Sequence, residues 1–143
     1  MAALAEAMTI GDGFGNAPET YRIRYDFAKD AGATGALDIF TADGDLLIVG
    51  AWAVVKTTCT SGGSATLIWG ISGGDTDIFC NTTQGAVASL TAGAVIVPPA
   101  LEGTPNVLPL PVKLASGGKL IQTIGTAALT AGVVEYVVQV IRP

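Results

Sequence analysis

Hydrophobic and polar residues alternate along most of the chain after its first twenty positions. In residues 21–29, "YRIRYDFAK", aromatic or aliphatic side chains occupy every second position, and mostly charged side chains lie between them. Alternation with a period of two is typical of a β-strand that buries one face and exposes the other. We therefore expect a strand at 21–29, and similar arguments apply to the segments that follow.

The rest of the chain predicts an all-β protein. Longer strand-like segments cover 33–40, 46–59, 65–71, 106–115, 119–129 and 133–141, and shorter ones cover 77–80, 86–90 and 94–98. Turn sequences separate them, such as the Asp-Gly turn "TADGD" at 41–45, and "GSATLIWGISGGDTDIFC" at 63–80 has the pattern of a β-hairpin. About eight strands without an interior helix favour an antiparallel β-sandwich, jelly-roll-like in its arrangement.

Local features add detail to this prediction. Gly50 lies inside the longest strand-like segment and predicts a bulge or bend. Pro109 and Pro111 have no N–H to donate to a sheet, so 106–115 is expected at an edge or in an extended connection. Leu-Thr-Ala-Gly occurs at 90–93 and again at 129–132, each time before a valine-rich run. We expect each copy to be a turn that launches a strand.

Residues 1–20 differ from the remainder. "AALAEAM" near the start has the composition of a helical turn or two, and "GDGFGNAPET" at 11–20 indicates an extended arm. The expected organisation is an N-terminal arm at 1–20 followed by one sandwich domain at 21–143. The start lacks the pattern of a secretory signal, and the longest apolar run, 46–55, is shorter than the ~20 residues of a membrane span. We expect a soluble protein made in the cytoplasm, without a membrane partner.

The composition indicates that much of the outer surface is buried against other chains. Half of the 143 residues are hydrophobic and only 13% are charged, whereas an average soluble domain has about 25% charged residues. A lone soluble domain normally covers itself with charge and avoids large apolar patches. The net charge of −5 argues against nucleic acid and against an anionic membrane as partners.

The sequence offers little for catalysis. It contains no histidine, which excludes the usual Ser-His-Asp and Cys-His arrangements and most zinc sites. The Asp43/Asp45 and Asp75/Asp77 pairs lie in predicted turns; they are expected to form those turns, with calcium binding or acid–base catalysis as alternatives. We expect no enzyme activity, no catalytic residue, no metal site and no cofactor.

Two cysteines and two tryptophans have alternative interpretations. Cys59 and Cys80 are outside any CxxC pattern and are expected as small buried side chains, with a disulfide between neighbouring strands as the alternative. Trp52 and Trp69 lie within apolar strand segments, where packing in the core or against a subunit is the usual role. Stacking on a sugar ring is the alternative.

Two parts of the chain resemble small virion proteins of tailed bacteriophages. These parts are "GALDIFTADGDLLIVGAWAVVKTTCTSGGSATLIWGI" and the closing "AALTAGVVEYVVQVI". The similar elements run from Asp38 to Val49, from Thr57 to Gly70 and from Ala128 to Ile141, and the resemblance spans roughly residues 20–142. The chain departs from the pattern at "TADGDLLIVGA", where an Asp-Gly turn replaces a proline-bearing "LPAGA".

The resemblance implies a capsid decoration (cement) protein. Such proteins are jelly-roll-like sandwiches, often homotrimers, seated on the outer surface of the capsid where major capsid proteins meet. The resemblance therefore implies a virion location, with the major capsid protein and further copies of the chain as partners. The alternative is a receptor- or glycan-binding module of a phage fibre or tail that uses Trp52 or Trp69.

Overall fold

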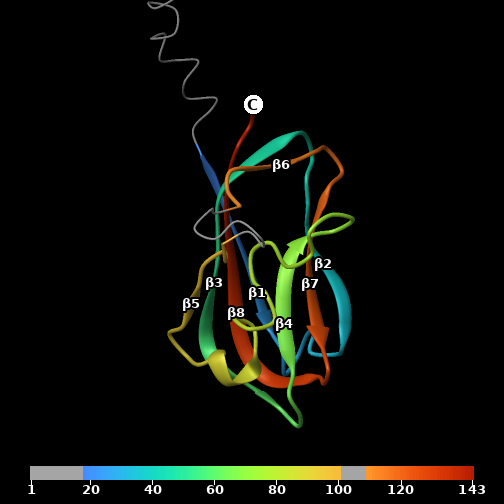
Figure 1. Cartoon of the computed structure of the whole chain (residues 1–143), viewed down its shortest axis with the longest axis vertical. Helices are drawn as coiled ribbons and strands as arrows, with labels where there is room; N and C mark the ends of the chain where they lie inside the picture. The colour runs from blue at the N-terminus through green and yellow to red at the C-terminus, as the bar shows by residue number, and fades with distance from the viewer. Residues whose placement is uncertain (1–17, 101–108) are drawn as a thin grey trace, which may run out of the picture.

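Two antiparallel sheets pack face to face in a computed structural model of the chain, which describes residues 18–100 and 109–143 (Figure 1). The five-stranded sheet has the order β1 (Glu19–Asp26), β8 (Leu129–Ile141), β3 (Leu46–Ser61) and β5 (Val95–Ile96), with β6 (Val112–Leu114) also paired to β3. The three-stranded sheet has the order β2 (Gly35–Thr41), β7 (Lys119–Gly125) and β4 (Thr66–Ile71). The predicted all-β antiparallel sandwich is confirmed.

The strand pairing is nested in the manner of a jelly roll. The first strand pairs with the last (β1 with β8), the second with the seventh (β2 with β7), and the third with the sixth (β3 with β6). Inside these pairs, the fourth strand, β4, forms an antiparallel bridge at Trp69 with Cys80 of the segment that follows it. The first four strands alternate between the two sheets, so the chain resembles one long antiparallel hairpin that has been rolled up.

Several predicted segments differ in detail from the observed strands. Residues 77–80 form no strand beyond the bridge to Trp69, and 86–90 contain a 3₁₀ turn, Val87–Ser89. Only Val112–Leu114 of the predicted 106–115 strand pairs with β3 among the described residues. The turns at 41–45 and 62–65 join strands of different sheets rather than hairpin partners. Backbone groups in these loops bond to residues distant in the sequence, as Phe79 N–H does to the Trp69 carbonyl and Val87 N–H to the Ala65 carbonyl, and the local pattern does not reveal these partners.

Strand ends and irregularities have local causes. β1 ends at Asp26 because the carbonyl of that residue accepts hydrogen bonds from the N–H groups of Lys29 and Asp30, while its carboxylate accepts one from Ala28. The bulge predicted at Gly50 is confirmed by a shift of register between Ile48 and Gly50. The predicted arm lies outside the described residues, apart from positions 18–20; Glu19 and Thr20 already belong to β1.

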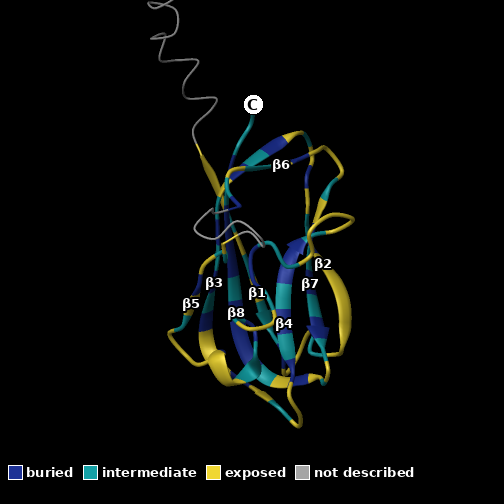
Figure 2. Ribbon diagram, viewed as in Figure 1, coloured by how far each residue is buried: buried dark blue, intermediate teal, exposed yellow. Residues whose placement is uncertain are grey.

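The core lies between the sheets, as the buried positions of Figure 2 show. β8 contributes Val134, Tyr136, Val138 and Val140, which alternate along the strand and are fully buried. The Tyr136 hydroxyl donates a 2.6 Å hydrogen bond to Oε1 of Gln122 on β7, which is also buried. This bond joins the two sheets through the middle of the core. Within the described parts of the chain, no helix is long and apolar enough to cross a membrane.

Candidate interaction surfaces

The aspartate pairs singled out by the sequence make structural contacts. Asp43 accepts a hydrogen bond from Arg142 at 3.1 Å, and Asp45 accepts one from the backbone N–H of Ser116 at 2.9 Å. Asp75 accepts a 3.2 Å hydrogen bond from the N–H of Asp77, which shapes the turn that contains both. Residues 18–100 and 109–143 contain no group of three or more side chains that could hold a metal ion.

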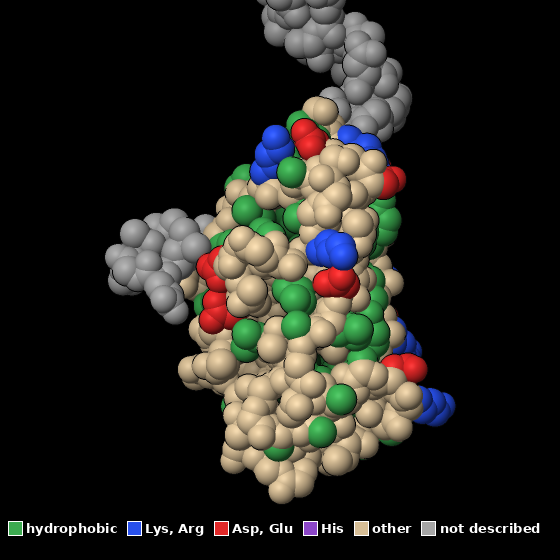
Figure 3. Space-filling view, turned by 90° about the vertical axis from the view of Figure 1, so that its right-hand side faces the viewer, with side chains coloured by type: hydrophobic (Ala, Val, Ile, Leu, Met, Phe, Trp, Pro, Cys, Tyr) green, Lys and Arg blue, Asp and Glu red, His purple; other side chains and the backbone are tan. Residues whose placement is uncertain are grey.

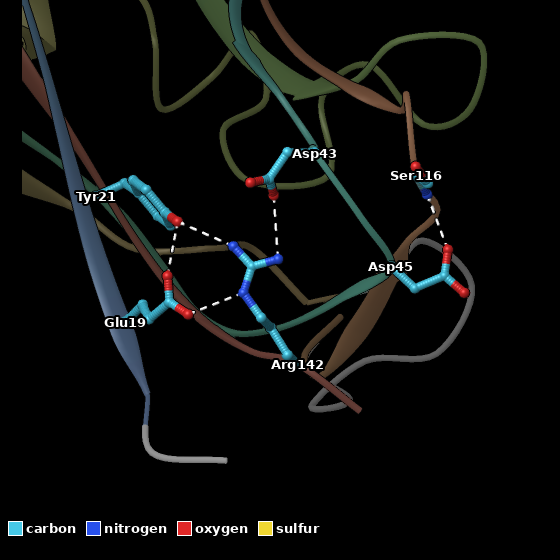
Figure 4. Close-up of polar contacts among 6 residues, drawn as sticks. All are labelled: Glu19, Tyr21, Asp43, Asp45, Ser116 and Arg142. Carbon is cyan, nitrogen blue, oxygen red and sulfur yellow. Dashed lines mark hydrogen bonds and ion pairs between the residues drawn. The ribbon is translucent and has the colours of Figure 1, made fainter. Parts of the chain in front are cut away.

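A charged cluster closes the end of the sandwich near the C-terminus (Figure 4). Arg142 lies at its centre, with Nε 2.9 Å from Glu19 and Nη1 3.1 Å from Asp43. Tyr21 donates a 2.7 Å hydrogen bond to the second oxygen of Glu19. We call this region, with the nearby Asp45–Lys113 ion pair, the charged end. Through Arg142, which directly follows β8, it connects the end of the chain to the start of β1 and to the turn between β2 and β3.

Two carboxylates of the charged end have lowered pKa values. Hydrogen bonds from Tyr21 and from Arg142 lower the pKa of Glu19. The backbone hydrogen bond from Ser116 lowers the pKa of Asp45, and the charge of Lys113 adds to this effect. Both carboxylates are therefore ionised at neutral pH, as the ion pairs require.

At the opposite end of the sandwich, hydroxyl groups rather than charges lie between β3 and β8; the Lys29–Asp26 ion pair of this end is on the loop that follows β1. We call residues 57–66 and 125–131 the hydroxyl end; neither range contains a charged residue. Thr60 and Thr130 share a hydrogen bond of 2.9 Å between their hydroxyl oxygens, and Ser61 donates one of 2.7 Å to the carbonyl of Ala128. These bonds connect β3 to the start of β8 without an ion pair.

The outer face of the five-stranded sheet has an apolar strip on β3 and β8, beside an ion pair of 3.0 Å between Arg22 of β1 and Glu135 of β8. The registers place Trp52 beside Val137, and Val54 between Glu135 and Val95. Val137 is fully buried although it faces away from the core, and Val95 has 58% of its surface exposed. These adjacent apolar side chains form a surface that another protein could bury. The composition predicts outward apolar surface but not its position in the fold.

The three-stranded sheet presents a different outer side. Figure 3 looks onto the side of the molecule where β2, β7 and β4 lie in Figure 1. Charged side chains form a few small groups there, and the surface between them is mostly uncharged. One ion pair of this sheet joins Lys119 to Asp38 at 2.8 Å.

The two tryptophans have separate roles. Trp69 is only 1% exposed and packs between Phe79 and Tyr136, with ring centroids 4.8 and 5.0 Å away. It therefore belongs to the core and cannot stack on a sugar at the surface. Trp52 is half-buried on the outer face of β3, next to Gly50. The glycan-binding alternative retains only this second tryptophan.

Both cysteines are free and buried. Burial raises the pKa of the Cys59 thiol to about 11 and that of Cys80 to about 12. Neutral, buried thiols of this kind act as small hydrophobic side chains, as the sequence predicts, and are poor nucleophiles.

A shallow groove lies along β5. It has a volume of about 250 Å³ and is lined by Gln84, Ser89 and the four residues 94–97. Val95 and Val97 have 58% and 57% of their surfaces exposed, more than the other exposed large hydrophobic residues that the structure describes. In a strand the residues on both sides of the buried Ile96 must face the other way, so the sequence "VIV" predicts that Val95 and Val97 point outward.

Comparisons with known proteins find similarity in fold. The sequence matches no protein-family profile, and no curated protein is similar to it. Solved structures with a similar fold include a chain of the cyanophage Pam1 capsid asymmetric unit, at 15% identity and a TM-score of 0.57, over 92% of this chain and 89% of that one. A chain of the Helicobacter pylori bacteriophage KHP30 capsid matches at 9% identity, with a TM-score of 0.57 over 88% of both chains. A chain of the Ralstonia phage GP4 capsid matches at 15% identity and 0.58, over 88% of this chain and 84% of that one. At these identities the matches show a shared fold.

Proposed function

We propose that the chain is a structural protein of a bacteriophage virion that decorates the outer surface of the capsid and stabilises it by binding across neighbouring major capsid proteins. The observation that carries this proposal is the shared fold with chains from three phage capsids, over at least 88% of this chain. The sequence resemblance to small virion proteins of tailed phages supports the same role.

The surface is suited to this role. A decoration protein needs a large surface that binds without a strong desolvation cost, and apolar surface contributes about 25 cal/mol per Å² when it is buried. The outer face around Trp52 and Val54 provides apolar area, and the hydroxyl end provides uncharged polar area. A partner that covers the apolar strip and leaves the Arg22–Glu135 ion pair at its rim in water would desolvate few charges.

We also propose that the protein acts as a homotrimer. A symmetric assembly repeats each contact with the shell, so that modest individual contacts combine into strong binding through avidity. Size-exclusion chromatography with light scattering measures the copy number directly. A single species of one copy at micromolar concentration would contradict the trimer.

The proposed role does not require catalysis. The chain has no histidine, and Asp43, Asp45 and Asp75 are held in hydrogen bonds that shape the structure. We accordingly propose that the protein is not an enzyme.

A reconstitution experiment tests the capsid role. Shells of the phage that encodes this chain, assembled without it, are mixed with the purified protein and sedimented. We expect saturable binding at a fixed number of copies per shell and a higher temperature of shell disruption. Absence of binding to these shells would overturn the proposed function.

The N-terminal arm is tested in the same assay. We propose that residues 1–20 reach onto a partner, so deletion of residues 2–16 should weaken binding while the sandwich still folds. Equal binding by the shortened protein, with an unchanged circular dichroism spectrum, would show that the arm does not contribute.

A further inference from the structure

The edges of the two sheets differ in how they are protected against another strand. β1 carries charged side chains along its whole length: Glu19, Arg22, Arg24 and Asp26. β2 contains a bulge after Asp38, and Asp38 is paired with Lys119. Charged side chains and bulges are two common ways in which proteins prevent strand addition at an edge.

The other three edges contrast more sharply. β6 carries the charge of Lys113 and follows Pro111, which has no N–H. β4 is covered by bridges from Thr66 to Ala86 and from Trp69 to Cys80. β5, the end strand of the five-stranded sheet, has neither a charge nor a bulge, and no charged residue occurs anywhere in 81–100. Among the edges that the structure describes, β5 is the one without these protections.

The register of β5 shows which way its backbone groups point. The N–H of Val55 donates to the carbonyl of Ala94, and Ile96 is opposite Ala53 in the same register. In an antiparallel pair, alternate residues bond to the partner strand, and those between them point away from it. The N–H and C=O of Val95, opposite Val54, therefore point away from β3, toward the free edge.

Contacts at Val97 agree with this direction. Val97 is two residues from Val95 and has the same orientation in the strand. Its carbonyl accepts a 2.8 Å hydrogen bond from the side chain of Gln84, which lines the groove along this edge. The groove thus presents one outward N–H and one outward C=O at Val95, next to the exposed side chains of Val95 itself and of Val97.

We propose that the β5 edge is a docking site for an extended, uncharged segment of the capsid shell protein, which adds to the five-stranded sheet beside Val95. This inference rests on the proposed function and names the contact that such a function would use. An extended backbone is the ligand that a free strand edge selects, and the exposed side chains of Val95 and Val97 favour apolar side chains in it. Pro98 and Pro99 lack N–H groups and restrict the docked segment to a short stretch.

The described strands of the chain itself fit this site less well. β1 would place its arginine and carboxylate side chains against an uncharged groove, and β2 is interrupted by its bulge. A second β5 would contribute a strand of only two residues. A segment of a different chain is therefore the occupant that the charges and lengths favour.

The closing experiment uses the full chain and the shells described above. Val95→Lys places a charge at the edge, and Val95→Pro removes the outward N–H without removing a hydrogen bond to β3. We expect Val95→Pro to raise the Kd for shells about tenfold, as the loss of one desolvated hydrogen bond predicts. Val95→Lys keeps the N–H but adds a charge that would lose water on docking, and it should raise the Kd by about tenfold as well. Leu37→Lys makes the same charge change at an exposed residue of the other sheet and should leave the Kd within about twofold.

Hydrogen exchange provides a readout that does not depend on a variant. In the wild-type protein the amide of Val95 should exchange rapidly when free and become protected on the shell. If the wild-type protein binds shells but both Val95 variants bind equally well and Val95 stays unprotected, the inference is overturned and the capsid role stands. If the wild-type protein does not bind, the proposed function itself fails. A change of copy number caused by Val95→Lys without shells would assign the edge to a second copy, which also overturns the inference.

Discussion

At the charged end of the sandwich, side chains with opposite charges join β1, β8 and the turn between β2 and β3. At the hydroxyl end, neutral hydroxyls and close backbone contacts join β3 to β8. Arg142 reaches three partners at the first end, whereas Gly132 at the edge of the second brings its backbone against Cys59. The first arrangement depends on ionisation and salt; the second depends on shape.

This difference bears on which surface a partner can cover. Burying a charged cluster in an interface carries a desolvation cost, which neutral hydroxyls largely avoid because they find partners easily. In the proposed role, we therefore expect the charged end to stay in water. The hydroxyl end and the apolar face beside it are better suited to contact the shell.

The largest expected effect tests the role of shape near the hydroxyl end. Gly132 has φ +121°, and a Cβ there would lie 2.6 Å from Cα of Cys59. Gly132→Ala should lower the free energy of unfolding by about 3 kcal/mol or more, because the backbone conformation and the contact both oppose a side chain. Chemical denaturation measures this change.

Gly44, at the charged end, provides the matched control. A Cβ there would meet only the Arg142 side chain, at an ordinary 3.5 Å. Gly44→Ala should leave the free energy of unfolding unchanged or raise it slightly. Equal losses in the two alanine variants would contradict the distinction between the two regions.

The second effect concerns the core between the two ends. Tyr136→Phe removes the donor to Oε1 of Gln122, which then stays buried without this partner. We expect a loss of about 1–3 kcal/mol in the free energy of unfolding. Tyr25→Phe is the control, because Tyr25 contacts the Tyr136 ring only at its edge; a comparable loss in both variants would argue against a specific role for the buried bond.

The third effect is a pH dependence of stability that arises from Glu19 and Asp45 at the charged end. The pKa values of Glu19 and Asp45 lie below their ordinary values of 4.5 and 3.8. A lowered pKa in the folded state means that the contribution to stability is present above the ordinary pKa and is lost as the pH falls through the folded one. Thermal unfolding followed from about pH 6 to about pH 3 should therefore show a steeper loss in the wild type than in Glu19→Gln/Asp45→Asn.

The size of this effect is modest, because both carboxylates are exposed to solvent and salt screens them. A difference of a few degrees in midpoint temperature at low salt is expected. The double variant Thr60→Val/Thr130→Val has no ionisable group altered and should follow the wild-type pH profile. A parallel profile for the carboxylate variant as well would show that these ion pairs do not contribute.

The smallest effect is the hydroxyl bond itself. A double-mutant cycle on Thr60→Val and Thr130→Val isolates the interaction across the 2.9 Å contact. Because both side chains are exposed, the coupling should be no more than about 0.5 kcal/mol. A coupling well above 1 kcal/mol would mean that this surface bond, rather than backbone packing, holds the hydroxyl end together.

The sequence alone determined the fold class and most strands. Alternation in β1, the long apolar runs of β3 and β8, and the bulge at Gly50 all follow from local physical rules of strand formation. The composition, with no histidine and few charges, separately predicts that the chain is not an enzyme and that its outer surface contacts other chains, and both stay predictions. These properties depend on which residues occur and at what spacing, so they are present before the chain folds.

Only the tertiary structure decided how those strands pair and what their residues meet. The two Leu-Thr-Ala-Gly segments are identical, yet 90–93 forms a turn before β5 while 129–132 opens β8 as part of the strand. Trp69 and Trp52 have similar local surroundings, but one lies in the core and the other on an outer face. The charged end joins Arg142 to Glu19 across almost the full length of the chain. Such contacts depend on nested pairing between strands that are distant in the sequence. The alternation of hydrophobic and polar residues within one segment does not show which distant segment it pairs with.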